Sequence, residues 1–239
     1  MNRIAMTSLV GTIAAAALVV GASAPAFAST STPTPATKTT RTLESVQTTA
    51  KTATGKRETA LSAAIAKLDV AKGISASDKA TLADRLNADL AGMKAIEAKI
   101  AADTTLAAAS TDLKTIFTTY RVFGVAIPQA HIVADIDRVT SIDIPKLTAS
   151  QSNLATVLTG KDASQSTAAL QSDLADMTKQ IAAASTELSG ASVKALAITP
   201  ADYNSNKTVV TSARASVKTA QSDLKQARAD RKAILAALK

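Results

Sequence analysis

Basic residues form the most concentrated charged group in this chain of 239 residues. Segment 205–239 contains eight lysines and arginines against two aspartates, while the whole chain has a net charge of +8. Written as heptads, seven of the eight fall into two neighbouring columns, which form one stripe on a helix. Such a stripe can hold a polyanion by many weak charge contacts. The predicted polyanion-binding residues are Lys207, Arg214, Lys218, Lys225, Arg228, Lys232 and Lys239.

An alternative interpretation of this stripe is a solvated helix face, partly neutralised by acidic neighbours such as Asp173 and Asp176. If the stripe binds, the partners that suit it are an anionic cell-wall polymer, a membrane surface or extracellular DNA. We do not expect nucleic acid, because no aromatic residues alternate with the basic ones to stack on bases.

Three of the chain's five aromatic residues lie close together at Phe117, Tyr120 and Phe123. Their spacing of three residues places them on one side of a helix. Because bulky side chains are otherwise scarce, we expect these three to anchor the core. The alternative is an exposed aromatic site for a ligand.

No set of residues predicts a reaction or a metal site. His131, the only histidine, stands four residues before Asp135, a spacing that indicates a helix surface pair. A zinc site needs more nitrogen or sulfur ligands, and the chain has no cysteine and no Gly-x-Ser-x-Gly motif. We therefore expect no catalytic residue, no metal and no cofactor. The dispersed acidic residues are interpreted as solvated helix faces: Glu58, Asp69, Asp84, Asp89 and Glu97.

The first 28 residues have the pattern of a secretory signal peptide. Arg3 precedes a short apolar run over 13–20, and Ala26-Phe27-Ala28 is an A-x-A cleavage pattern. The run is too short for a membrane span, which needs roughly 20 residues. Residues 29–40, rich in Ser, Thr and Pro, predict a flexible tether. We expect a secreted protein, peripherally associated with the cell wall or free of it.

Residues 41–239 predict a single all-α domain. Alanine, the strongest helix former, accounts for 53 of the 239 residues. Apolar periodicity, Gly and Pro positions and capping patterns predict helices over 41–72, 76–101, 103–123, 128–159, 165–189 and 200–238, with a loop over 190–199. We expect Pro128 to kink or restart the chain and Pro145 to bend it. The fold class is an elongated antiparallel helical bundle of five or six helices with coiled-coil-like packing.

The last predicted helix has the clearest heptad pattern. One column recurs every seven residues and a second is offset by three: Tyr203, Val210, Val217, Leu224, Arg231 and Leu238, and Ala213, Ala220, Ala227 and Ile234. This a/d seam predicts close packing within the bundle. The alternative is a seam shared between chains, which would make the protein a self-associating structural coiled coil.

The whole plan resembles uncharacterised exported Ala-rich helical proteins of high-GC Gram-positive bacteria. The resemblance rests on the signal peptide, the tether, the Ala-rich helices and a short Tyr120-Arg121-Val122-Phe123…Pro128…Ala134-Asp135 motif. It implies no activity, substrate or catalytic residue. The leading hypothesis is a non-enzymatic secreted or wall-associated protein; the others are the self-associating coiled coil and a wall-acting hydrolase.

Overall fold

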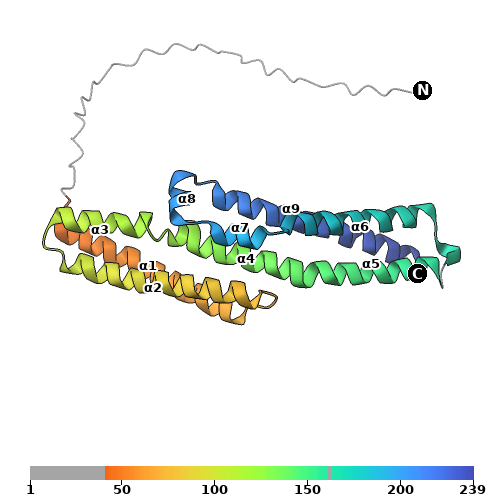
Figure 1. Cartoon of the computed structure of the whole chain (residues 1–239), viewed down its shortest axis with the longest axis horizontal. Coiled ribbons are helices and arrows are strands. Elements are labelled where there is room, and N and C mark those ends of the chain that lie inside the picture. The colour runs from red at the N-terminus through yellow and green to blue at the C-terminus, as the bar shows by residue number, and fades with distance from the viewer. Residues whose placement is uncertain (1–40, 161–162) are drawn as a thin grey trace, which may run out of the picture. The chain divides into compact units, whose positions relative to one another are not determined.

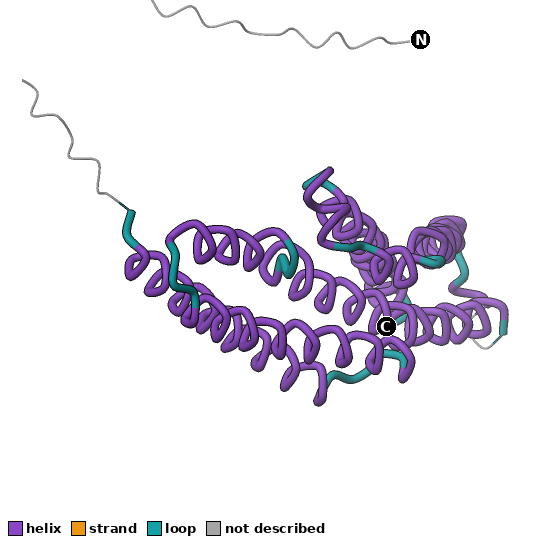
Figure 2. Tube along the Cα trace, turned by 60° about the vertical axis from the view of Figure 1, so that its left-hand side comes forward, coloured by secondary structure: helices purple, strands orange, loops and turns teal. Residues whose placement is uncertain are grey.

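The described part of the protein is entirely helical in its regular structure. A computed structural model describes residues 41–160 and 163–239, which contain helices and turns but no strand (Figures 1 and 2). The predicted signal peptide, 1–28, and tether, 29–40, lie outside the described residues. Six long helical stretches correspond to the six predicted ones, so the all-α bundle is confirmed.

The first two helices form a hairpin. α1 (Leu43–Val70) starts at a capping box between Thr42 and Ser45, and α2 (Ala76–Ala102) starts at Ser75. Gly73 takes the positive φ of 82° that the turn requires. The Ser75 hydroxyl accepts from the Asp78 amide and so caps the start of α2. The Ser75 amide donates to Asp137 Oδ2 at 2.8 Å, which ties the turn to α4.

α3 (Leu106–Thr118) packs on both α1 and α2, which gives a three-helix group. Gln47 of α1 fastens this group near the end of α2. Its side-chain amide donates to the carbonyls of Ile100, Ala101 and Asp103 at 3.1 to 3.3 Å. The last carbonyls of a helix lack the usual partner four residues further along, so the glutamine acts as a C-terminal cap. The Asp103 amide also donates to the Ile100 carbonyl at 3.3 Å.

A long helical stretch follows, built from alternating π and α turns. It comprises η1 (Val122–Ala126), α4 (Ile127–Arg138), η2 (Val139–Asp143) and α5 (Ile144–Thr159) (Figure 1). A proline removes one helical hydrogen bond and crowds the carbonyl four residues earlier. For Pro128 and Pro145 those carbonyls belong to Gly124 and Ser141, each inside a π turn. The wider turn therefore absorbs each proline, and the chain stays helical.

The C-terminal part contains η3 (Ala163–Gln165), α6 (Ala168–Leu188), α7 (Ala191–Ala197), α8 (Pro200–Ser205) and α9 (Val209–Ala237). The prediction of a loop over 190–199 is wrong, because α7 occupies most of it. α8 starts at a capping box between Thr199 and Asp202 with Pro200 in the first turn, and the chain breaks between Ser205 and Val209, so the predicted helix over 200–238 is divided in two.

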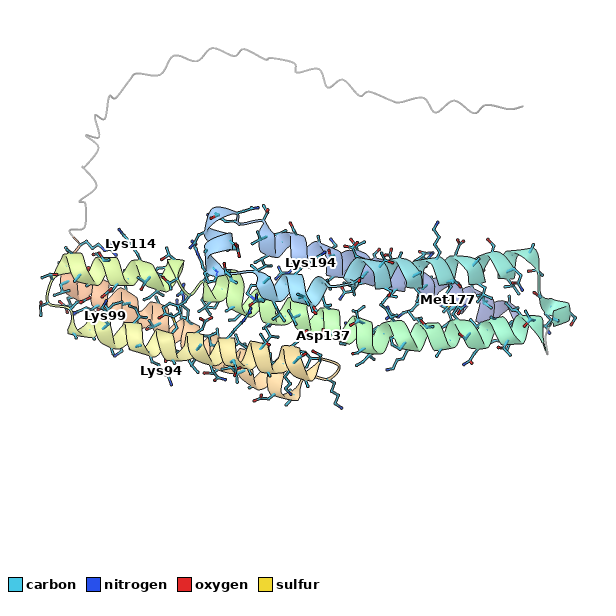
Figure 3. The ribbon with its side chains drawn as sticks, viewed as in Figure 1. Lys94, Lys99, Lys114, Asp137, Met177 and Lys194 are labelled. Atoms are coloured by element: carbon cyan, nitrogen blue, oxygen red, sulfur yellow. The ribbon has the colours of Figure 1, made fainter. Side chains whose placement is uncertain are left out.

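The heptad seam of α9 packs against α6 in the same chain. Val210, Val217 and Leu224 are buried, as are Ala220, Ala227 and Ile234. Two members of the predicted first column do not join this seam, because Tyr203 lies in α8 and Arg231 is exposed. α6 and α9 form the most extensive helix pair in the described residues, and Met177 lies buried between them (Figure 3). The predicted intramolecular seam is confirmed, and α6 occupies the surface that a second chain would need.

The prediction that Phe117, Tyr120 and Phe123 together anchor the core is wrong. Phe117 is 39% exposed and Phe123 is 51% exposed; only Tyr120 packs partly against the core. The reason is that α3 ends at Thr118 and Arg121 adopts a left-handed conformation with φ 44°. The three aromatics therefore do not share one helix, and the core is built from aliphatic side chains.

Candidate functional site

The predicted basic stripe lies along the exposed surface of α9. Arg214, Lys218, Lys225, Arg228 and Lys232 are all exposed, and Lys207 and Lys239 are exposed just beyond the helix ends. At about 100° per residue, the five helical side chains fall within an arc of about 80°. They span roughly 27 Å of helix at 1.5 Å per residue. The stripe is thus a continuous line of cations.

Little of this charge is neutralised within the described residues. Arg228 forms an ion pair with Asp143 of η2 at 3.7 Å, and Asp143 also pairs with Arg138 at 2.9 Å. The described residues show no ion pair between the stripe and Asp173 or Asp176, the acidic neighbours considered from the sequence. Asp223 and Asp230 lie on the other flank of the seam. The stripe therefore keeps most of its charge available to solvent.

A second feature joins two arginines to the exposed aromatics. The Arg57 guanidinium lies 4.6 Å from the Phe117 ring centroid and 5.1 Å from that of Phe123, and Arg121 lies 5.3 Å from the Tyr203 centroid. These are cation–π distances. Desolvation lowers the pKa of Arg57. The cluster explains how the phenyl rings stay at the surface.

An apolar recess with convergent polar groups lies between α2, η1, α4 and the α7–α8 connection. Its volume is about 300 Å³, and Leu82, Leu86, Val125 and Ile198 form part of its wall. Asp89 of α2 also lines it and is half-buried. Burial raises the pKa of the Asp89 carboxyl to about 6. The prediction that Asp89 belongs to a solvated helix face is wrong.

Sequence reasoning missed this recess, although a signal was present. The buried residues of α2 follow one another at steps of three and four, and the position missing from this series is 89: Leu82, Leu86, Met93 and Ile96. The spacing of three and four places Asp89 on the apolar face. Leu90, which the sequence pattern offers for that step, is only partly buried. Glu97 also departs from a purely solvated face, because it accepts a hydrogen bond from buried Thr54.

Gln129 and Arg85 build the polar edge of the recess. The buried Gln129 amide donates to the carbonyls of Ala195, Leu196 and Ile198 at 2.7, 3.2 and 2.9 Å, which caps the end of α7. Arg85 Nη1 donates to the Leu196 carbonyl and to Gln129 Oε1. Gln129 of α4 thus holds α7 against α4, and Arg85 of α2 ties α2 to both helices, so the recess has a fixed wall.

The remaining candidate residues form no site in the described part of the chain. His131 is exposed on α4, and no ion pair joins it to Asp135 there. The described residues contain no group of three or more side chains able to hold a metal ion. Asp137, labelled in Figure 3, is buried beside the α1–α2 turn, and this desolvation raises its pKa.

Comparisons with known proteins add no assignment to this geometry. Within 41–160 and 163–239, no helix combines the length and the apolarity that a membrane crossing requires. No protein-family model matches the chain, and no curated protein or solved structure shows significant similarity to it.

Proposed function

We propose that this is an exported, non-enzymatic protein that binds an anionic cell-wall polymer through the basic stripe of α9. The observation that carries the proposal is the alignment of five exposed cations on one narrow face of α9. The exported location rests on the signal-peptide pattern of residues 1–28.

The stripe suits a linear polymer better than a compact anion. Its charges follow one another along the helix and do not converge on a point. A polymer lying along α9 would release its condensed counterions, so each contact adds weakly and affinity falls steeply with salt. The single pair between Arg228 and Asp143, at 3.7 Å, leaves the other cations free of acidic partners in the described residues.

Binding of inorganic polyphosphate at several salt concentrations tests the proposal. We expect a triple variant, Lys218→Gln with Lys225→Gln and Lys232→Gln, to lower the slope of log K against log salt by about 2 to 3, at roughly 0.7 to 0.9 per lost contact. A matched control replaces three exposed lysines of α1 and α2: Lys51→Gln, Lys56→Gln and Lys94→Gln.

Equal losses in the two triple variants would show that net charge, and not the stripe, governs binding. Stronger binding to anionic lipid vesicles than to polyphosphate would move the partner to a membrane surface. In cells, release from the wall fraction by a high-salt wash is expected; recovery in the medium without added salt would contradict wall binding.

Self-association through the heptad seam is the second function considered from the sequence. The seam of α9 is buried on α6, so a shared coiled coil would first have to displace α6. Sedimentation at several concentrations separates the two proposals, because only the coiled coil requires oligomers that grow with concentration.

A further inference from the structure

We propose that the recess between α2, η1, α4 and the α7–α8 connection binds a small ligand that carries a protonated amine on a compact apolar body. Asp89 is the counter-ion, and the apolar walls receive the body. This site is independent of the stripe on α9.

The Asp89 carboxylate lines the recess without a partner in the described residues. No hydrogen bond or ion pair there reaches it, and its pKa is raised by burial alone. A half-buried carboxylate without a compensating partner is less favourable than a fully solvated one. Retaining one at a core-facing position of α2, where the periodicity calls for an apolar residue, indicates a functional role.

Of the two charged side chains in the lining, the Asp89 carboxylate is the one without a partner in the described residues, which favours a cationic ligand. Arg85 is the only basic side chain of the lining, and its Nη1 donates to the Leu196 carbonyl and Gln129 Oε1. A divalent metal ion would need several oxygen ligands, whereas Asp89 supplies the only carboxylate of the lining.

The size and the walls define the rest of the ligand. A volume of about 300 Å³ exceeds the cavity of about 150 Å³ that holds a benzene ring. The lining is mainly aliphatic, with the Tyr120 side chain among it. A single ring or a short branched chain next to the amine therefore fits the recess.

Calorimetric titration with 2-phenylethylamine tests the proposal, with neutral 2-phenylethanol as the matched probe. We expect the amine to bind at least about tenfold more tightly than the alcohol, because only the amine pairs with a half-buried carboxylate. Asp89→Asn should remove this preference while keeping the weak binding of the alcohol. Asp84→Asn, at an exposed carboxylate of the same helix, should leave it unchanged.

Location is tested separately by tyrosine fluorescence. The chain has two tyrosines and no tryptophan, so Tyr203→Phe leaves Tyr120 in the recess as the only strong emitter. The amine should change this emission with the affinity found by calorimetry. Equal binding of amine and alcohol, equal losses in the two aspartate variants, or no saturation by either probe would overturn the proposal.

Discussion

Asp89 is an acidic residue at a core-facing position of α2, and it lines the recess for which we propose an amine ligand. It shares the core-facing side of α2 with Leu86 and Met93, and burial raises its pKa to about 6 from an ordinary value of 3.8. Folding therefore favours the protonated form. The ionised form reduces stability, and this loss grows as pH rises through about 6.

Asp89→Asn should stabilise the protein at pH 7, where the wild-type carboxylate is ionised. After allowance for partial solvent screening we expect a gain of about 1 kcal/mol, or an increase in Tm of roughly 2–4 °C. The gain should shrink as pH falls through 6 and vanish below pH 4, where both proteins are uncharged at this position. Thermal unfolding followed by circular dichroism at several pH values measures this, and a constant gain would contradict it.

On α3, Ile116 lies in the core, whereas the next residue, Phe117, lies at the surface. Ile116 is fully buried, whereas Phe117 is 39% exposed and stacks on Arg57. We expect Ile116→Ala to cost about 2–5 kcal/mol. Phe117→Ala should cost only about 1–2 kcal/mol, from partial burial and the cation–π contact. Urea unfolding of the two variants decides, and a larger loss at Phe117 would restore it to the core.

At the scale of elements, two glycines each allow a tyrosine side chain to pack closely on a helix. Gly92 of α2 faces the Tyr120 ring, and a Cβ there would lie 2.2 Å from Tyr120 Cε1. Gly124 of η1 faces Tyr203 in the same way, with 3.0 Å to Cε1. Because glycine has no side chain, each tyrosine ring packs directly on a helix backbone. Tyr120 in the recess wall can therefore lie close to α2, and α8, which carries Tyr203, can lie close to η1.

Gly92→Ala and Gly55→Ala should therefore have opposite effects on stability. Both glycines lie inside long helices, but a Cβ at Gly55 would meet nothing within 4 Å. We expect Gly55→Ala to stabilise by about 0.5–1 kcal/mol through helix propensity. Gly92→Ala should destabilise by about 1–3 kcal/mol because Tyr120 must move. Chemical unfolding measures both, and stabilisation by Gly92→Ala would contradict the close contact.

Patterns within short stretches of the sequence predict most of the helices. The features that they do not predict, α7 and the recess at Asp89, depend on contacts between residues far apart in the sequence. The heptad seam of α9 and the Thr199–Asp202 cap are local patterns, and both are present. α7 has only seven residues, too few for a stable isolated helix, and its end is capped by distant Gln129. The stripe was also visible from spacing, whereas the recess at Asp89 depends on α7 packing against α4 and α2.

At the scale of residues 40–239, which form one compact unit, α4 and α5 connect the helix groups. α4 contacts α1, α2, α7 and α9, and α5 contacts α6 and α9. The connections rely on aliphatic burial and backbone capping, since the three ion pairs in the described residues each have an exposed cation. Exposed pairs contribute about 0–1 kcal/mol each.

Sodium chloride should therefore separate binding from folding. We expect Tm to change by only a few degrees between low and high salt, while polyphosphate affinity falls by orders of magnitude. Circular dichroism and the binding titration in the same buffers provide the comparison. A parallel fall in Tm would show that the lost affinity reflects unfolding and not the screening of the stripe.

The glutamine caps give the protein a particular chemical vulnerability. Gln47 and Gln129 each point one amide nitrogen at three backbone carbonyls. Deamidation would replace that donor with an oxygen that carries negative charge, so the attraction to the carbonyls would become repulsion. Hydrolysis of a single bond at Gln129 would thereby release α7 and open the recess.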